Sequence, residues 1–230
     1  MTRRAFLTKI SPALMLPAGV ALGLSRSALA QAAGDVVLVE AGPEAALVDF
    51  LAGTLTLSAQ FDHQQSGRGG RVQTFKGEML LKRPGRFRWE IQSPYAQLQI
   101  IRDNSFLLYD ADLAQLTKRP LESALDATPA GLLLSAGPEA AQTVARQFSM
   151  QALPSQPGLR RVLLRPKASE GSATSLEVGL NDKGEIVQFE LADALGRRSL
   201  VRLRGIKRNQ PIADSQFQFI PPPGTEVVQP

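Results

Sequence analysis

Two stretches of alternating apolar and polar residues, separated by a Pro-Gly pair, constrain the fold of this chain most strongly. Residues 72–81 alternate before Pro84-Gly85, and Phe87, Trp89 and Ile91 occupy every second position after it. Successive side chains of a strand point to opposite faces, so this spacing places three large apolar side chains on one face and the charged residues between them on the other. The pattern predicts two strands joined by a tight turn, with one apolar face that other parts of the chain must cover.

The same alternation recurs along most of the chain, and Asn181-Asp182-Lys183-Gly184 is typical of a hairpin turn. Ten or eleven antiparallel strands with few helices predict a mainly β, strongly curved antiparallel sheet or incomplete barrel in a single domain. Further strands are expected at Thr54–Gln65, Leu98–Arg102, Ser105–Asp110, Ala114–Lys118, Phe148–Leu153, Arg160–Pro166, Ser175–Leu180, Glu185–Leu191, Ser199–Gly205 and Gln216–Ile220, and residues 225–230 could add a short one.

Helical spacing predicts a helix at Pro43–Leu51 and short helical pieces at Glu122–Asp126, Pro129–Ser135 and Pro138–Gln147. Thr128-Pro129 supplies a capping residue followed by proline at the first helical position. Because residues 132–134 are all leucine, the second of the short pieces presents apolar side chains around much of its circumference. It is either a buried helix or a lid over an apolar space.

Residues 1–30 are typical of an export signal. A basic start with Arg3-Arg4 precedes an apolar run at Ile10–Leu24, and Ala28-Leu29-Ala30 is a small-x-small cleavage site before Gln31. The apolar run of about 15 residues is too short to span a membrane. The paired arginines suit a twin-arginine signal as well as an ordinary secretory one. We expect a mature domain over residues 31–230 that is located in the periplasm.

The charge of the chain resides largely in this signal. Residues 1–30 hold four basic residues and no acidic ones, so the formal net charge of +5 falls to about +1 when they are removed. A nucleic-acid partner is therefore not expected. The chain has no cysteine, so it lacks both disulfides and a lipid-modified N-terminal cysteine, and about 200 mature residues are enough for one core.

The sequence offers little support for catalysis, so we expect neither an enzyme nor a cofactor or metal. His63 is the only histidine, and we place it on the polar face opposite Phe61, where a solvated role is expected. There is no Gly-x-Ser-x-Gly elbow, and histidine or cysteine at metal-ligand spacing is missing.

The aromatic side chains of the expected strands mostly share the face of the aliphatic ones. In a filled sandwich these side chains form the core, whereas in a half-closed barrel capped by helices they line a cavity. The pattern by itself is compatible with both arrangements. The residues concerned are Phe61, Phe75, Phe87, Trp89, Phe106, Phe189, Phe217 and Phe219.

The central stretch resembles the periplasmic outer-membrane lipoprotein carrier protein family (LolA family). The resemblance rests on Lys82-Arg83-Pro84-x-x-Phe87-x-Trp89, followed by Pro94-Tyr95 and the strand Leu98–Arg102. It extends in order over roughly residues 42–228. The other matching pieces are Leu47-x3-Leu51, Ala59-x-Phe61, Tyr109-Asp110, Gln115-x-Thr117, Thr128-Pro129-x-x-Leu132-Leu133, Pro166-Lys167 and Phe217-x-Phe219-x-Pro221-Pro222-x-Gly224.

This resemblance implies an incomplete antiparallel barrel with an apolar hollow covered by lid helices. It implies a monomeric carrier that takes acylated lipoproteins from an inner-membrane ABC transporter to an acceptor lipoprotein in the outer membrane. On the same fold, a carrier of another lipid, such as a glycolipid or a pigment-pathway lipid, stays an alternative.

The resemblance also implies a site. Arg83 matches the family's lid latch, whose guanidinium holds backbone carbonyls of the covering helices; its partners here would lie at Leu51 and around Leu133 and Leu134. Phe87 matches an aromatic at the mouth of the hollow. The residues expected to line the cavity or its mouth are Leu47, Phe61, Phe75, Phe87, Trp89, Ile91, Phe106, Leu132, Phe189, Phe217 and Phe219.

Two features depart from the family pattern. Gly131 lies in the expected lid helix, where bulkier residues are usual. A basic run near the penultimate strand is either a solvated strand face or a docking surface for an acidic partner or an anionic head group. The run consists of Arg197, Arg198, Arg202, Arg204, Lys207 and Arg208.

Overall fold

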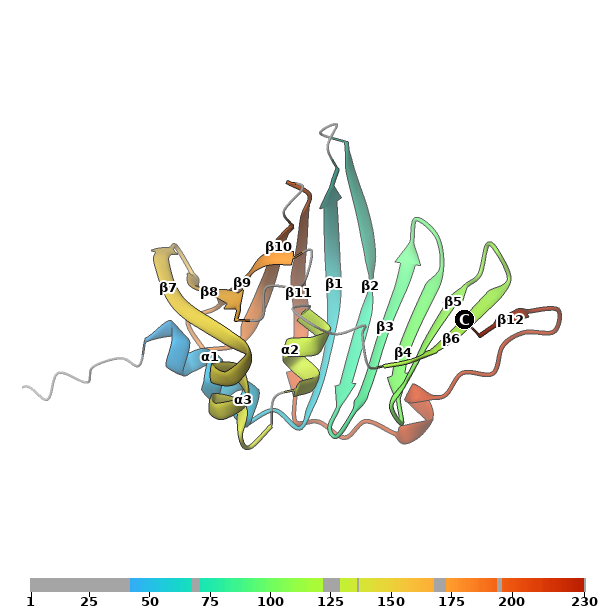
Figure 1. Cartoon of the computed structure of the whole chain (residues 1–230), viewed down its shortest axis with the longest axis horizontal. Coiled ribbons are helices and arrows are strands. Elements are labelled where there is room, and N and C mark those ends of the chain that lie inside the picture. Colours follow the sequence, from blue (N-terminus) through green and yellow to red (C-terminus); the bar gives the residue numbers. More distant parts are fainter. Residues whose placement is uncertain are drawn as a thin grey trace, which may run out of the picture. The chain divides into compact units, whose positions relative to one another are not determined.

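One sheet of twelve strands organises the chain, in the order β12-β6-β5-β4-β3-β2-β1-β11-β10-β9-β8-β7 (Figure 1). All neighbours in this order pair antiparallel except β12 and β6, which pair parallel. The strands are β1 (Thr56–Ser66), β2 (Val72–Lys82), β3 (Arg86–Ser93), β4 (Gln97–Arg102), β5 (Ser105–Asp110), β6 (Gln115–Pro120), β7 (Phe148–Gln156), β8 (Leu159–Pro166), β9 (Ala173–Leu180), β10 (Ile186–Asp193), β11 (Arg198–Arg208) and β12 (Glu226–Val228).

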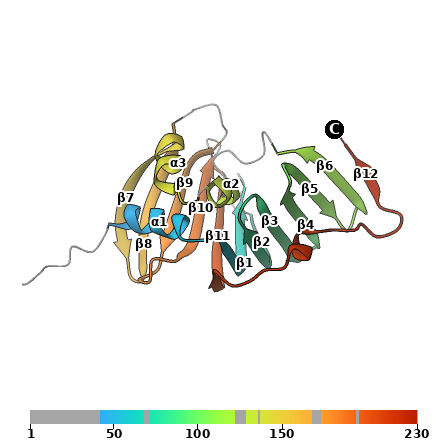
Figure 2. The same ribbon diagram turned by 90° about the horizontal axis from the view of Figure 1, so that it is seen from below.

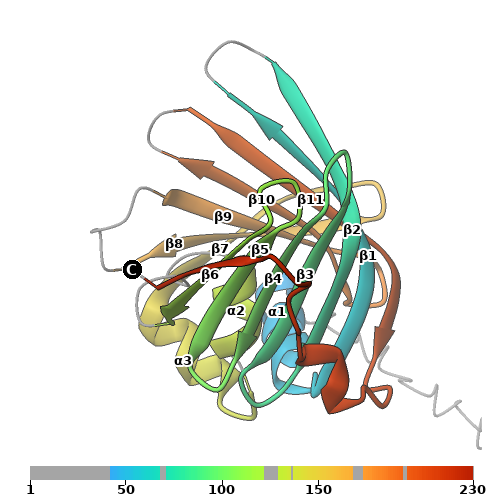
Figure 3. The ribbon, with the colours of Figure 1, turned by 90° about the vertical axis from the view of Figure 1, so that its right-hand side faces the viewer.

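The computed structural model describes residues 42–67, 71–121, 129–135, 137–167, 173–193 and 196–229. The expected export signal at residues 1–30, its cleavage site and the expected helical piece Glu122–Asp126 lie outside these residues. Within them, the end strands β12 and β7 do not pair with each other, so the sheet stays open. The open, curved sheet with few helices (Figure 3) confirms the expected fold class.

The register of the central strands gathers the apolar side chains on one face. Phe61 of β1 lies opposite Gly77 of β2, which in turn lies opposite Ile91 of β3. Met79 of β2 lies opposite Trp89 of β3, two pairs further along. Because side chains alternate along each strand, these residues share one face, which we call the inner face; the opposite side is the outer face.

Three helices cover the inner face (Figure 2): α1 (Pro43–Ala52), α2 (Pro129–Ser135) and α3 (Ala140–Gln147). Helix α1 contacts β7, β8 and β9, α3 contacts α1 and β7, and α2 contacts β3. The predicted bounds of α1 and α2 hold to within one residue, whereas α3 begins at Ala140 because a turn closed by the Ala140 amide and the Gly137 carbonyl (2.8 Å) precedes it. None of the helices in the described ranges is long and apolar enough to cross a membrane.

The C-terminal segment corrects one expected strand. Residues 216–220 do not form a strand; Asp214–Phe217 forms a 3-10 turn, η1, which lies against β3 and β4. Side chains rather than a neighbouring strand bind carbonyls in this segment. Lys82 Nζ donates to the Ile212 carbonyl (2.8 Å) and Arg88 Nη1 to the Gln216 carbonyl (3.2 Å). The chain then ends in β12, the short strand that the sequence allowed.

Asn209 fixes the point where this segment leaves β11. Its φ of 58° lies in the left-handed region, which asparagine tolerates better than most residues. Its Oδ1 accepts from the Leu55 amide at 2.8 Å, and its Nδ2 donates to the Gly53 carbonyl at 2.8 Å. One side chain therefore joins the end of β11 to the loop that follows α1.

Gly77 is required by the close approach of β3, which gives a first prediction. A Cβ at this position would lie 1.8 Å from the Glu90 carbonyl oxygen and 2.8 Å from Cζ of Phe61. Because backbone cannot move aside cheaply, Gly77→Ala should lower the free energy of unfolding by at least about 2 kcal/mol. Thermal unfolding followed by circular dichroism measures this loss as a drop in Tm.

Gly67→Ala is the matched control, since no atom lies within 4 Å of a Cβ built at Gly67. It should change the free energy of unfolding by no more than about 0.5 kcal/mol. Equal Tm values for the two variants would contradict the packing described for Gly77.

Candidate functional site

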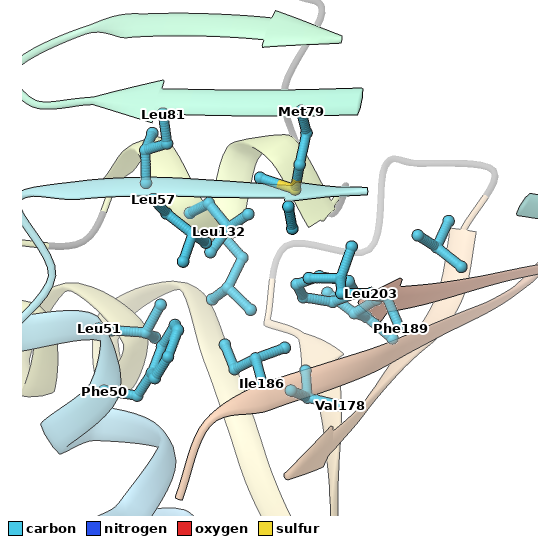
Figure 4. Packing of buried hydrophobic residues seen from close by; sticks show 14 of the residues in the cluster. Phe50, Leu51, Leu57, Met79, Leu81, Leu132, Val178, Ile186, Phe189 and Leu203 are labelled. Carbon is cyan, nitrogen blue, oxygen red and sulfur yellow. The ribbon is translucent and has the colours of Figure 1, made fainter. Parts of the chain in front are cut away.

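Most of the residues expected to line a cavity come together on the inner face. They belong to one buried apolar cluster formed by the helices and by strands from both halves of the sheet (Figure 4). Their exposed fractions are at most 7%, apart from Trp89, which is half-buried and packs against the cluster. The predicted residues found there are Leu47, Phe61, Phe75, Phe87, Trp89, Ile91, Phe106, Leu132 and Phe189.

Aromatic rings form the middle of this cluster. Phe61 of β1 and Trp89 of β3 stack with ring centroids 3.7 Å apart and planes inclined by 12°. Phe87 extends the stack, with its centroid 6.3 Å from that of Trp89. The Phe61 ring can lie over β2 towards Trp89 because Gly77, the residue opposite Phe61, has no side chain; a Cβ there would lie 2.8 Å from Cζ of Phe61.

The inner face beneath the helices is filled in this structure. Phe50 and Leu51 of α1 and Leu132 of α2 are at most 1% exposed, and they reach the same cluster as Leu57 and Phe189 (Figure 4). Of the two arrangements that the sequence allows, a filled core or a lined cavity, the structure has the filled core, because side chains of the helices occupy the space over the sheet. Two cavities lie elsewhere: one of about 470 Å³ between hairpin ends, and one of about 350 Å³ between α1 and the β9–β10 turn.

Phe217 and Phe219 do not join this cluster, which corrects the sequence prediction. Phe217 is 1% exposed but lies in η1, which packs on β3 and β4. Phe219 contacts Tyr109 of β5 with ring centroids 4.7 Å apart. Tyr109 alternates with Leu108, which packs against the inner cluster, so the Phe219 contact lies on the outer face. The C-terminal segment thus covers the outer face with these two rings.

His63 is also placed differently from the prediction, because residues 61 and 63 share a face of β1. Its ring lies 5.5 Å from that of Phe75 and 6.2 Å from that of Trp89. Nε2 is 2.7 Å from Ser199 Oγ, whereas Nδ1 is buried and has no hydrogen-bond partner among the described residues. Burial lowers the pKa of His63 below 6.5, since water is removed from the ring, so the side chain is neutral at pH 7.

Arg83, at the end of the β2–β3 hairpin, binds the ends of two helices. Its Nη1 donates to the carbonyls of Leu51 and of Thr54, the latter at 2.7 Å, and its Nη2 donates to the Leu133 carbonyl at 2.7 Å. The bonds described for the guanidinium thus end on Leu51 and Leu133 but not on Leu134. Thr54 is an additional partner that sequence reasoning missed; its position just past the expected helix end was the only signal.

Helix geometry explains why this position suits an arginine. The last carbonyls of a helix lack intrahelical partners and carry partial negative charge. Leu51 lies in the last turn of α1, and Leu133 lies in the last turn of α2. One planar guanidinium can donate to both ends at once, because its donors point in different directions.

The position of Arg83 is fixed from its own backbone as well. Its amide donates to the Leu55 carbonyl at 2.9 Å, which ties the hairpin end to the loop after α1. Burial lowers the pKa of Arg83 to about 10, so the side chain still carries its charge at pH 7. The buried Nε has no hydrogen-bond partner among the described residues, so Nη1 and Nη2 carry the polar contacts.

Two arginines of the basic run near β11 pair with acidic residues of the neighbouring strands. Arg204 pairs with Asp62 of β1, and Arg198 Nη1 lies 3.2 Å from Glu190 Oε1 of β10. Arg208 lies over the ring of Phe50, 5.3 Å from its centroid. These basic side chains thus have partners in the fold. The described residues contain no group of three potential metal ligands.

Comparison with known proteins gives a consistent family. The family model described as outer membrane lipoprotein carrier protein LolA matches residues 52–220. An outer-membrane lipoprotein carrier protein of Leptothrix cholodnii is 37% identical over 212 residues, covering 91% of this chain and 96% of that protein. One of Chromobacterium violaceum is 31% identical over 202 residues, covering 88% of this chain and 95% of that protein.

A solved structure supports the fold alone. An uncharacterized conserved protein from Thermus thermophilus superposes with a TM-score of 0.51 at 14% identity, covering 80% of this chain and 95% of that one. The match of the family model, together with two relatives more than 30% identical over nearly their full lengths, identifies the family. The chain belongs to the outer membrane lipoprotein carrier protein (LolA) family.

Proposed function

We propose that this chain carries acylated lipoproteins through the periplasm, hiding their acyl chains against the inner face. The observation that supports this most directly is the apolar inner face closed by helices whose ends meet at Arg83. Family membership and the names of the relatives agree with this function. In this proposal the cargo comes from an inner-membrane ABC transporter and goes to an acceptor lipoprotein in the outer membrane, with the carrier acting as a monomer.

The energy of the cargo explains why such a carrier is needed. Burial of a methylene group is worth about 0.8 kcal/mol, so one chain of about 16 carbons left in water costs on the order of 13 kcal/mol. A carrier must offset this cost and still release the chain. It can do so if its own inner face packs well when empty, because that packing competes with cargo.

Arg83 is the proposed latch of the empty form. Its bonds to Leu51 and Leu133 require α1 and α2 to lie in their closed positions. A cargo chain that separates the helices from the sheet would break at least one of these bonds. Since charge-assisted hydrogen bonds contribute about 1.5–3 kcal/mol each, the latch would oppose loading and favour release.

The carrier function can be tested directly with the purified mature chain. Incubation with inner-membrane vesicles that contain a labelled triacylated lipoprotein and its release transporter should yield a water-soluble complex of carrier and lipoprotein. Size-exclusion chromatography separates the complex from vesicles. Lipoprotein that stays with the vesicles at all carrier concentrations would contradict the proposal.

Replacement of Arg83 gives a second prediction. Arg83→Leu should fold, because the packed cluster does not include Arg83, but it should destabilise the closed form by about 2–4 kcal/mol. Affinity for a fluorescent acyl probe should then rise, by up to roughly 30-fold for each 2 kcal/mol. Transfer of bound lipoprotein to outer-membrane vesicles should slow. Arg83→Lys should be intermediate, since an ammonium keeps the charge but loses the planar fork.

Arg102→Leu is a suitable control, because Arg102 is an arginine at a strand end whose partner is its neighbour Asp103 (2.7 Å). It should leave acyl affinity and transfer unchanged. If Arg83→Leu transfers lipoprotein at the same rate as the protein without the substitution, Arg83 is not a latch.

A third prediction concerns the start of the mature chain. We propose that residues 1–30 are removed on export, since the sequence at residues 28–30 is a small-x-small site. Mass spectrometry of the protein recovered from periplasm should give an N-terminus at Gln31. Recovery of the uncleaved chain in the membrane fraction would rule out a shuttle.

A further inference from the structure

The larger cavity lies between the ends of two hairpins that project past the helices, β1–β2 and β10–β11 (Figures 1 and 3). It has a volume of about 470 Å³. The part of its lining that the structure describes is rich in hydrogen-bond donors and includes no acidic side chain: Gln65, Ser66, Gly67, Arg71, Gln73, Leu191, Arg197, Arg198 and Ser199. Such a lining suits a ligand group that accepts hydrogen bonds and carries negative charge.

This cavity continues the inner face. Along β1, the inner-face positions run from Phe61 through His63 to Gln65, so the face changes from apolar to polar towards the hairpin end. Along β11 they run from Leu203 to Ser199, which lines the cavity and lies within hydrogen-bond distance of His63. A single molecule with an apolar chain and a polar end fits such a gradient.

The His63 ring marks the boundary between the two regions. Its Nδ1 is buried without a hydrogen-bond partner among the described residues. An unsatisfied buried polar atom is unfavourable, and a ligand that opens the inner face can expose or bind it. With the helices in place, Nδ1 of His63 thus lacks a hydrogen-bond partner among the described residues, at the point where the polar end of a ligand would lie.

The arginines at the rim of the cavity differ in their ion-pair partners and in their exposure. Arg198 pairs with Glu190 on the outer side of the sheet. Arg71, directly before β2, is exposed and lines the cavity. Arg71 is therefore well placed to meet an anionic group, and Arg197 lines the same cavity.

We propose that this cavity binds the anionic, phosphate-class head group of an acyl lipid, whose chain extends along the inner face towards Phe61 and Trp89. The inference rests on the proposed function, because it uses the inner face as the acyl site. It extends the range of ligands beyond acylated proteins to anionic acyl lipids. Arg71 supplies the charge, and Ser199, Gln65 and Gln73 supply hydrogen bonds.

Probes with one chain and different heads test this orientation. Decyl phosphate, decanol and decylamine are used to displace a fluorescent acyl probe from the mature chain. Decyl phosphate should bind at least tenfold more tightly than decylamine and more tightly than decanol. Inorganic phosphate at millimolar concentration and constant ionic strength should not displace the probe; displacement by phosphate alone would mean a simple anion site and would overturn the inference.

Arg71→Gln should weaken decyl phosphate binding about fivefold, the effect of one exposed ion pair, and change decanol binding less than twofold. Lys76→Gln is the matched control: it removes the same charge from β2, five residues further on, at an exposed position that alternates with Phe75, on the outer face. Equal losses in both variants would overturn the inference. If the three probes bind equally, the head-group site is wrong while the carrier function stands; if none binds, the proposed function fails as well.

Discussion

Two helix ends meet at one guanidinium, and this interaction joins the helices to the sheet. Helices α1 and α2 are short, and each has terminal carbonyls that need partners. Arg83 donates to Leu51 of α1 and to Leu133 of α2 from the end of a hairpin that belongs to the sheet. The bonds therefore join both helices to the sheet as well as to each other. In the proposed carrier these bonds would have to break, together with the apolar contacts of the helices, before cargo could reach the inner face.

The filled inner face explains why the latch proposed for Arg83 would affect the binding of cargo. In the structure, side chains of α1 and α2 occupy the space over β1, β3 and β10, so an acyl chain has to replace protein contacts rather than enter an empty pocket. The net affinity for a chain is then the difference between two large burial terms. Such a balance suits a protein that must both accept and surrender cargo, and it makes the affinity sensitive to the few polar bonds that favour closure.

Alternation of residues was sufficient to predict most of the sheet. The strands from β1 to β11 for which bounds were expected occur within three residues of them, because each buries apolar side chains on one face: all but β6 place residues in the apolar cluster, and β6 buries Leu116. The alternating Phe217 and Phe219 gave the same signal, but there Lys82 and Arg88 bind carbonyls of the C-terminal segment, and its rings pack on the outer face. Local alternation cannot predict that side chains, rather than a neighbouring strand, will bind the backbone carbonyls of a segment.

The site was only partly accessible to sequence reasoning. Residues two apart share a face, so His63 could have been placed beside Phe61 from the pattern alone. Whether the inner face is filled or hollow could not be predicted, because that depends on how closely the helices approach the sheet. Thr54 accepts from Arg83 only because the chain bends back after α1, with Asn209 binding the Gly53 carbonyl. The contact between Asn209 and Gly53 joins residues far apart in the sequence, so no local spacing predicts it.

Trp89 offers the most direct test of whether cargo chains occupy the inner face. It is the only tryptophan in the chain and stacks on Phe61 within the cluster. Bromine atoms quench tryptophan fluorescence on close contact, so a lipopeptide with brominated acyl chains reports their position. Titration with this lipopeptide should quench Trp89 strongly and saturably, whereas the same lipopeptide without bromine should not. Stoichiometric binding of the brominated lipopeptide without quenching would place the chains elsewhere and contradict a carrier that opens its inner face.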